Sequence, residues 1–171
     1  MEREGILDEV ARRYALERGH ALAGAHAAVV RNFLPDLSET ETWTLEARIP
    51  DGPATRHYTE RYVGSPADPA MPHAVRALVH IAEYPGPADT REGLLLALAQ
   101  LMAPRLPNCA ERGLAIGELC FCGLDDPPTR IYFVRGNVKV EVTSIGLTPV
   151  GVADLAGIVD RQLQASLKPP S

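Results

Sequence analysis

The chain has 171 residues, of which 46% are hydrophobic and 23% charged, a composition typical of a folded globular protein rather than a disordered one. The formal net charge is -5, with 17 basic and 22 acidic residues, which disfavours a nucleic-acid partner because phosphate binding requires a positive surface. No apolar run reaches the roughly 18 residues of a transmembrane helix, so no membrane span is predicted.

The first ten residues, MEREGILDEV, are charged from the second position and contain no apolar segment typical of a signal peptide. A cytoplasmic location follows if Met1 is the native start, and an extracytoplasmic one if a signal peptide has been removed. No phosphate-binding glycine motif is present, and no cofactor is expected.

Residues 1–70 are predicted to form a helix and a meander of strands within the same domain as the rest of the chain. In residues 4–18, Ile6, Val10 and Tyr14 recur at helical spacing, with acidic residues first and arginines last, which suits the helix dipole. Gly19 is the expected helix stop. We interpret residues 27–33 as a strand.

Two further strands are predicted before the middle of the chain. Residues 43–49 alternate between apolar and polar side chains, which is typical of a strand with one buried face. Residues 56–63 form a second such run, and the turn sequence PDGPAT between the two favours a hairpin or meander. Residues 64–72 contain three prolines, cannot continue a ladder, and mark the boundary before the second half.

Residues 71–167 are predicted to form a β-α-β-β-β-α core, followed by a tail at 168–171. The core begins with a strand over 74–84 and a helix that ends near Pro104, with Asp89 and Glu92 as a capping-box-like pair. A strand over 114–122 follows a loop, and Thr148-Pro149 is expected to open a final helix that runs through Leu167. The predicted fold class is therefore α+β, an antiparallel sheet backed by helices.

A β-hairpin is the clearest local prediction, over residues 130–144. Two β-branched and aromatic runs flank Gly136-Asn137, a pair that suits a two-residue turn. In this register Arg135 faces Val138. The expected dry face carries Ile131, Phe133, Val138, Val140 and Val142, and the expected half-wet face carries Tyr132, Val134, Lys139 and Glu141.

The chain has three cysteines, an odd number that argues against a dense disulfide framework. Cys120 and Cys122 share one face of a predicted strand, where core packing is the usual role. One disulfide would join Cys109 to either of them. A zinc site with His80 is disfavoured because the spacing does not match tight zinc knuckles, so no metal site is predicted.

The candidate binding residues are histidines and aromatics on predicted strands together with one arginine at the hairpin. Arg135 stands beside the turn on an otherwise apolar face, and we expect it to reach water or to contact a carboxylate of the final helix such as Asp160. No catalytic residue is assigned. The candidate set for a ligand or partner is His57, Tyr58, Tyr62, His80 and Arg135.

The second half resembles small α+β domains of uncharacterised bacterial proteins, many of them exported or lipid-anchored. The likeness covers about residues 74–165 and is carried by the segments VRALVHIAEYPGPADTREGLLLALAQL, IGELCFCG, IYFVRGNVKVEV and VADLAGIVDRQL. These segments correspond to predicted strands, helices and a hairpin turn. The resemblance therefore implies the fold and favours binding over catalysis, but it carries over no catalytic residue.

Two hypotheses of function follow. The first is a non-enzymatic module that binds a protein or a small ligand through the wet face of the sheet or the proline-rich loops, with a second copy of the chain among the partners considered. The alternative is a small hydrolase or transferase with a histidine and a carboxylate such as Glu60 in a cleft between the two halves.

Overall fold

A computed structural model describes residues 3–16, 29–38, 40–50, 57–64, 70–71, 74–103 and 105–167. Its centre is a six-stranded sheet in the order β1-β2-β3-β6-β5-β4, in which every neighbouring pair is antiparallel. The strands are β1 (Trp43–Pro50), β2 (His57–Gly64), β3 (Arg76–Glu83), β4 (Leu119–Cys122), β5 (Arg130–Arg135) and β6 (Val138–Ser144).

Three α-helices and one 3-10 helix accompany the sheet in the described part of the chain: α1 (Arg3–Arg13), α2 (Pro87–Ala99), η1 (Cys109–Arg112) and α3 (Ala153–Ser166). The second half has the predicted order β-α-β-β-β-α, and the predicted α+β class is confirmed. Among the described residues no helix is long and apolar enough to cross a membrane.

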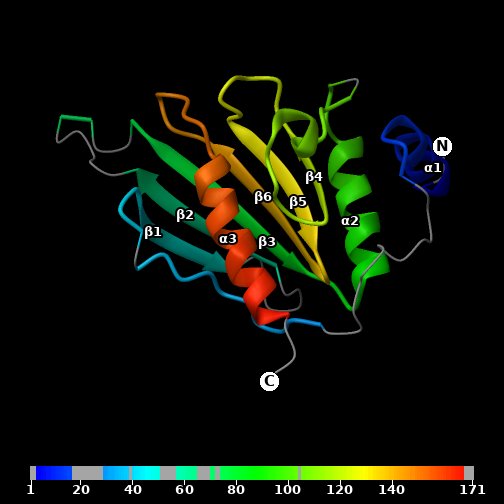
Figure 1. Cartoon of the computed structure of the whole chain (residues 1–171), viewed down its shortest axis with the longest axis horizontal. Coiled ribbons are helices and arrows are strands. Elements are labelled where there is room, and N and C mark those ends of the chain that lie inside the picture. Colours follow the sequence, from blue (N-terminus) through cyan, green and yellow to red (C-terminus); the bar gives the residue numbers. More distant parts are fainter. Residues whose placement is uncertain are drawn as a thin grey trace.

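The helices cover the two faces of the sheet, because alternate residues of each strand point to opposite sides. The helix α3 crosses one face, and α2 lies on the other side with α1 beyond it (Figure 1). On the α3 side, Phe133 and Val140 pack with Leu155 and Val159 in one core cluster. On the α2 side, a second cluster joins residues of β4 and β5 to α2 and α1.

The hairpin has the predicted register. Arg135 pairs with Val138, Phe133 with Val140, and Ile131 with Val142. The turn uses a positive φ at Gly136, +55°, whereas Asn137 has no positive φ. The predicted half-wet face is only partly so, because α2 buries the two β5 residues Tyr132 and Val134. The two β6 residues of that face, Lys139 and Glu141, line an open groove instead.

The predicted strand at 27–33 is wrong in its described part, and the side chain of Asn137 pairs with this segment instead. Residues 29–33 form no strand, and 27–28 lie outside the described part. Instead, the Val30 amide donates to Asn137 Oδ1 at 2.8 Å, and Asn137 Nδ2 donates to the Val30 carbonyl at 2.9 Å. A buried side-chain amide thus pairs with this segment as a neighbouring strand would, and the Phe33 amide donates to Glu83 Oε1 at 2.5 Å.

Both predicted helix starts in the second half are wrong. The helix α2 begins at Pro87, and its N-cap Gly86 has no side-chain cap, so Asp89 lies within the first turn, where a carboxylate still suits the helix dipole. The helix α3 begins at Ala153 rather than near Thr148. Neighbouring strand ends engage the intervening backbone: the Thr148 amide donates to the Ala74 carbonyl at 2.8 Å, and the Val152 amide to the Pro128 carbonyl at 3.0 Å.

Three further boundaries differ from the prediction. The helix α2 ends at Ala99 rather than near Pro104, with Gln100 as its C-cap. The strand β4 covers 119–122 instead of 114–122, because the chain turns at Gly117, whose φ is +66°. The helix α1 ends at Arg13, before the expected stop at Gly19, and Ala15 follows with φ +52°. Gly19 itself lies outside the described residues. The turn at 51–56 and most of the proline-rich 64–72 also lie outside the described part, whereas the antiparallel pairing of β1 with β2 is as predicted.

Candidate functional site

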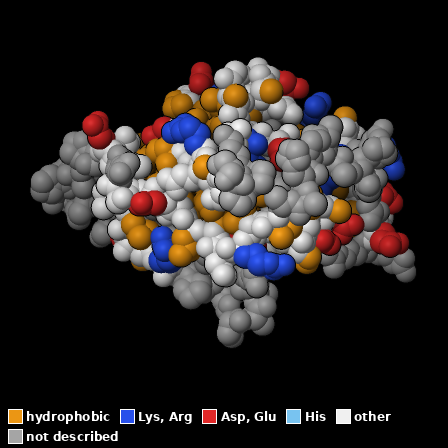
Figure 2. Space-filling model, turned by 60° about the horizontal axis from the view of Figure 1, so that its bottom comes forward, with side chains coloured by type: hydrophobic (Ala, Val, Ile, Leu, Met, Phe, Trp, Pro, Cys, Tyr) orange, Lys and Arg blue, Asp and Glu red, His pale blue; other side chains and the backbone are white. Residues whose placement is uncertain are grey.

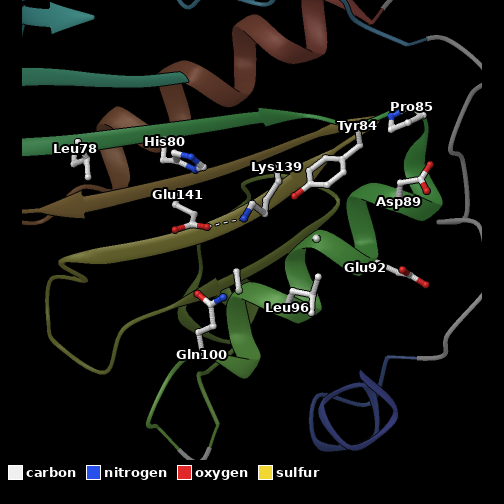
Figure 3. A pocket seen from close by; sticks show the side chains of 12 residues that line it. Leu78, His80, Tyr84, Pro85, Asp89, Glu92, Leu96, Gln100, Lys139 and Glu141 are labelled. Atoms are coloured by element: carbon white, nitrogen blue, oxygen red, sulfur yellow. Dashed lines mark hydrogen bonds and ion pairs between the residues drawn. The ribbon is translucent and has the colours of Figure 1, made fainter. Parts of the chain in front are cut away.

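A groove of about 610 Å³ lies between α2 and the side of β3 and β6 that faces this helix (Figure 3). It forms because α2 packs on β5 and β6, while the sheet continues past the helix through β3. The sheet supplies Leu78, His80, Lys139 and Glu141. The helix α2 supplies Asp89, Glu92, Gly93, Leu96 and Ala97, and its C-cap residue is Gln100. Tyr84 and Pro85 lie where β3 leads into the helix.

Lys139 is the most enclosed charged side chain of the groove. It alternates with the dry-face valines of β6 and so points toward α2, and its side chain is 9% exposed. The ammonium donates to Glu141 Oε1 at 2.8 Å. Of the described residues, Glu141 supplies the one hydrogen-bond acceptor of this ammonium. Since a lysine ammonium has three donors, the others have no protein partner in the described part of the chain.

Tyr84 closes the groove where β3 ends. Its backbone is fixed by the hairpin turn, because the Tyr84 amide donates to the Asn137 carbonyl at 2.8 Å and Asn137 Nδ2 donates to the Tyr84 carbonyl at 3.0 Å. Its ring lies against Gly93 of α2, where a Cβ would come within 2.2 Å of the phenol oxygen. The absence of a side chain at Gly93 therefore lets the ring approach the helix.

The phenol of Tyr84 is in its neutral form at neutral pH. Burial raises the pKa of Tyr84, the positive charge of Lys139 lowers it, and the negative charge of Glu141 raises it again. Figure 3 shows the hydroxyl of Tyr84 directed into the groove toward Lys139. A protonated phenol thus lies beside the ammonium without neutralising its charge.

His80 and Glu141 are direct neighbours across β3 and β6, and both line the groove. A histidine beside a carboxylate is the pair that the catalytic hypothesis requires. The carboxylate is not Glu60, however. Glu60 pairs with Val79, a residue of the α3-side core, so the register sets Glu60 on the other face of the sheet from His80. The groove also lies between the sheet and α2 rather than between the two halves of the chain.

The five candidate binding residues are divided between the two faces of the sheet. His80 lines the groove, and His57, opposite Ala82, is in register with that same face. Tyr58 and Tyr62 lie opposite Ile81 and Ala77, on the α3 face. The side chains of the three β2 candidates lie outside the described part of the structure. We therefore place these three residues by backbone register alone.

Arg135 contacts Asp160 of α3, as predicted. Its Nε donates to Asp160 Oδ1 at 2.5 Å and its terminal nitrogen to Oδ2 at 2.9 Å, a two-pronged pair. These hydrogen bonds raise the pKa of Arg135, while burial lowers it less. With 17% and 6% of the two side chains exposed, this ion pair joins the hairpin to α3 and is not an open binding site.

Sequence reasoning missed the residues that give the groove its chemistry. Lys139 and Glu141 were expected on a half-wet face, and Tyr84 as a strand end, without a site among them. One signal was available: Lys139 and Lys168 are the only lysines of the chain, and Lys139 lies among the valines of a strand. The position of α2 over the sheet forms the groove, and no single sequence motif predicts that position.

The cysteines form one disulfide, between Cys109 and Cys120, with 5.3 Å between their Cα atoms. It ties η1 to the edge strand β4, beside a backbone bridge between Asn108 and Phe121. Cys122 is a buried free thiol in the same core cluster. No group of three or more histidine, cysteine, aspartate or glutamate side chains with metal-binding geometry occurs among the described residues.

The surface shows no concentration of positive charge on the face in Figure 2. There, lysine and arginine side chains of the described residues are interspersed with acidic and apolar ones (Figure 2). No protein-family model, curated protein or solved structure matches this chain. The resemblance drawn from the sequence stays an expectation, and the groove is the basis for a proposal of function.

Proposed function

We propose that this protein is a binding module that takes up a small ligand in the groove between α2 and the sheet. The observation that carries the proposal is Lys139. Its side chain is 9% exposed and lines a cavity of about 610 Å³, and its ammonium has a single hydrogen-bond partner among the described residues. Burial of a charge is costly unless its hydrogen bonds are satisfied, so a ligand that completes them gains affinity.

The groove has the size and composition of a small-molecule site. Ligand pockets span about 300–1,000 Å³ and combine apolar walls with a few placed polar groups. Here Leu78 and Leu96 supply apolar surface, while His80, Tyr84 and Lys139 supply the polar groups. These groups lie on or directly after regular elements of the sheet, which favours a site that is formed before the ligand arrives.

A fragment screen followed by two-dimensional NMR tests this proposal. Fragments that bind should shift the backbone signals of β6 and of α2 around Leu96 and Gln100 together. Ala97→Phe fills the groove from α2 and should abolish these shifts. Ala165→Phe, a change at an exposed helix alanine of α3, should leave them intact. If no fragment perturbs the groove at millimolar concentration, the protein is not a small-ligand module of this kind.

A second candidate is favoured by the position of His80 directly opposite Glu141 across β3 and β6. In a small hydrolase or transferase, His80 would act as general base and Glu141 would orient its imidazole. Hydrolysis of an activated ester such as p-nitrophenyl acetate tests this candidate. If this candidate is correct, the rate falls at least tenfold in His80→Gln while ligand binding in the groove is retained. Equal rates in the native chain and in His80→Gln contradict it.

A further inference from the structure

The ligand class follows from the charges along the groove, and this inference rests on the function proposed above. Lys139 is the one lysine or arginine among the described lining residues. Its ammonium keeps donors beyond the bond to Glu141, and no other described residue accepts from it. An acceptor on the ligand, most strongly a negatively charged one, completes this set.

Tyr84 strengthens the case for a negatively charged ligand group. A tyrosine phenol is protonated at neutral pH, and burial raises the pKa of Tyr84 further, so this phenol does not compete with a ligand for the Lys139 charge that Glu141 already shares. Figure 3 shows the Tyr84 hydroxyl and the Lys139 side chain facing the same part of the groove. A group seated against the ammonium therefore also lies beside a phenol, whose O–H is a hydrogen-bond donor.

The carboxylates of the groove repel a ligand more strongly the more negative charge it carries, so they favour one negative charge over two. Glu141 is already paired with Lys139, and a ligand with two negative charges would be repelled by it. In Figure 3, Asp89 and Glu92 point away from the Lys139–Glu141 pair, so they offer no acceptor to a cation placed there. Their charges at the rim add to the repulsion of a multiply charged anion.

The remaining walls set the body of the ligand. Leu78 on β3 and Leu96 and Ala97 on α2 face the groove with aliphatic side chains. Burial of apolar surface contributes about 25 cal/mol per Å², so an aliphatic or aromatic body gains affinity here that a sugar or a free inorganic anion does not. An anionic head and an apolar body together describe an organic acid.

We propose that the groove binds a small monocarboxylic acid, with its carboxylate on the Lys139 ammonium beside Tyr84 and its apolar body between Leu96 of α2 and Leu78 of β3. No bond is made or broken in this step. The acid exchanges hydration for one charge-assisted hydrogen-bond set and one apolar contact surface.

Titration with three six-carbon probes of one shape tests the ligand class: hexanoate, hexylamine and hexanol, followed by NMR at pH 6. Hexanoate should bind at least tenfold more tightly than either of the others, with shifts at β6 and α2. Lys139→Met should weaken hexanoate at least tenfold and leave hexanol unchanged. Arg105→Gln, which removes an exposed cation outside the groove, should change nothing.

Glu141→Gln provides an opposite change in the same site. It removes the carboxylate that shares Lys139, so hexanoate should bind several-fold more tightly, a gain that a purely structural ion pair would not produce. Equal or stronger binding of hexylamine or hexanol in the groove overturns the acid and leaves the binding function standing. The same holds if other fragments bind the groove but none of the three probes does. A groove that no fragment perturbs overturns the proposed function itself.

Discussion

The ion pair between Arg135 and Asp160 offers a direct test of how α3 is attached to the sheet. Asp160→Ala leaves the guanidinium without its carboxylate in a site where 17% of the arginine side chain is exposed. Removing one partner of a buried pair costs about 3–5 kcal/mol. The negative charge of Glu118 also acts on Arg135, so we expect the lower end of this range, about 3 kcal/mol. This corresponds to a fall of about 6–12 °C in Tm.

Urea unfolding of Asp160→Ala, Arg135→Met and the double variant measures the coupling between the two side chains. We expect the double variant to be more stable than the sum of the single losses predicts, by about 1–3 kcal/mol. Glu9→Ala is the matched control, because it removes an exposed i,i+4 pair with Arg13 and should cost less than about 1 kcal/mol. Additive losses at Arg135 and Asp160 would refute the assignment of this pair as the link to α3.

Three other predictions concern the groove wall and the disulfide. Gly93→Ala places a methyl group against the Tyr84 ring and should destabilise by about 1 kcal/mol net, as a packing cost of about 1–3 exceeds a helix gain of about 1. The control is Gly157→Ala on α3, where the new methyl group meets only the tip of an arginine at 3.4 Å; it should stabilise the protein by about 0.5–1 kcal/mol. Thermal unfolding measures both variants, and a stabilised Gly93→Ala would contradict the contact with Tyr84. Reduction of the Cys109–Cys120 disulfide should lower the free energy of unfolding by about 3 kcal/mol, the loop-closure value for a short loop. A Cys109→Ser/Cys120→Ser variant that is as stable in urea as the oxidised chain would argue against the bond. Because burial raises the folded-state pKa of Tyr84, the stability contributed by its neutral phenol is present below about pH 10 and is lost as pH rises through the folded-state pKa. Tyr84→Phe should therefore lose less stability than the native chain between about pH 9 and about pH 11. Equal losses in the two proteins would refute the burial of this phenol.

The hairpin was predictable in full register because its information is local. Alternation fixed the faces of β5 and β6, and Gly136 marked the turn. The contact of Arg135 with Asp160 was predictable from the same register, since a lone cation on an apolar face requires a partner from the element that covers that face. Periodicity likewise identified β1, β2, β3 and α2.

The helix starts and the short strand β4 were not predictable, because tertiary contacts decide them. The segment before α3 donates its amides to Ala74 and Pro128, which the sequence does not place nearby. The positive φ of Gly117 ends the extended run before β4, and a glycine gives no local sign of which φ it adopts. In the N-terminal segment, a buried asparagine side chain 107 positions away takes the place of a strand partner at Val30.

The groove escaped prediction because its walls come from three separate segments. His80 was singled out, but Lys139 and Glu141 were read as solvent-facing, and only the position of α2 over β6 turns that face into a cavity wall. Tyr84 enters the site because Gly93 lets its ring lie on the helix. The periodicity of hydrophobic residues does not predict the angle at which a helix packs on a sheet.

The affinities of the native chain and of Lys139→Met for hexanoate show directly whether Lys139 anchors a carboxylate ligand. Measured by NMR titration at pH 6, the native chain should bind hexanoate in the groove, and Lys139→Met should bind it at least tenfold more weakly while keeping the dispersed spectrum of the folded protein. Equal affinities in the two proteins, with signals of β6 and α2 shifted alike, would show that Lys139 does not anchor the carboxylate.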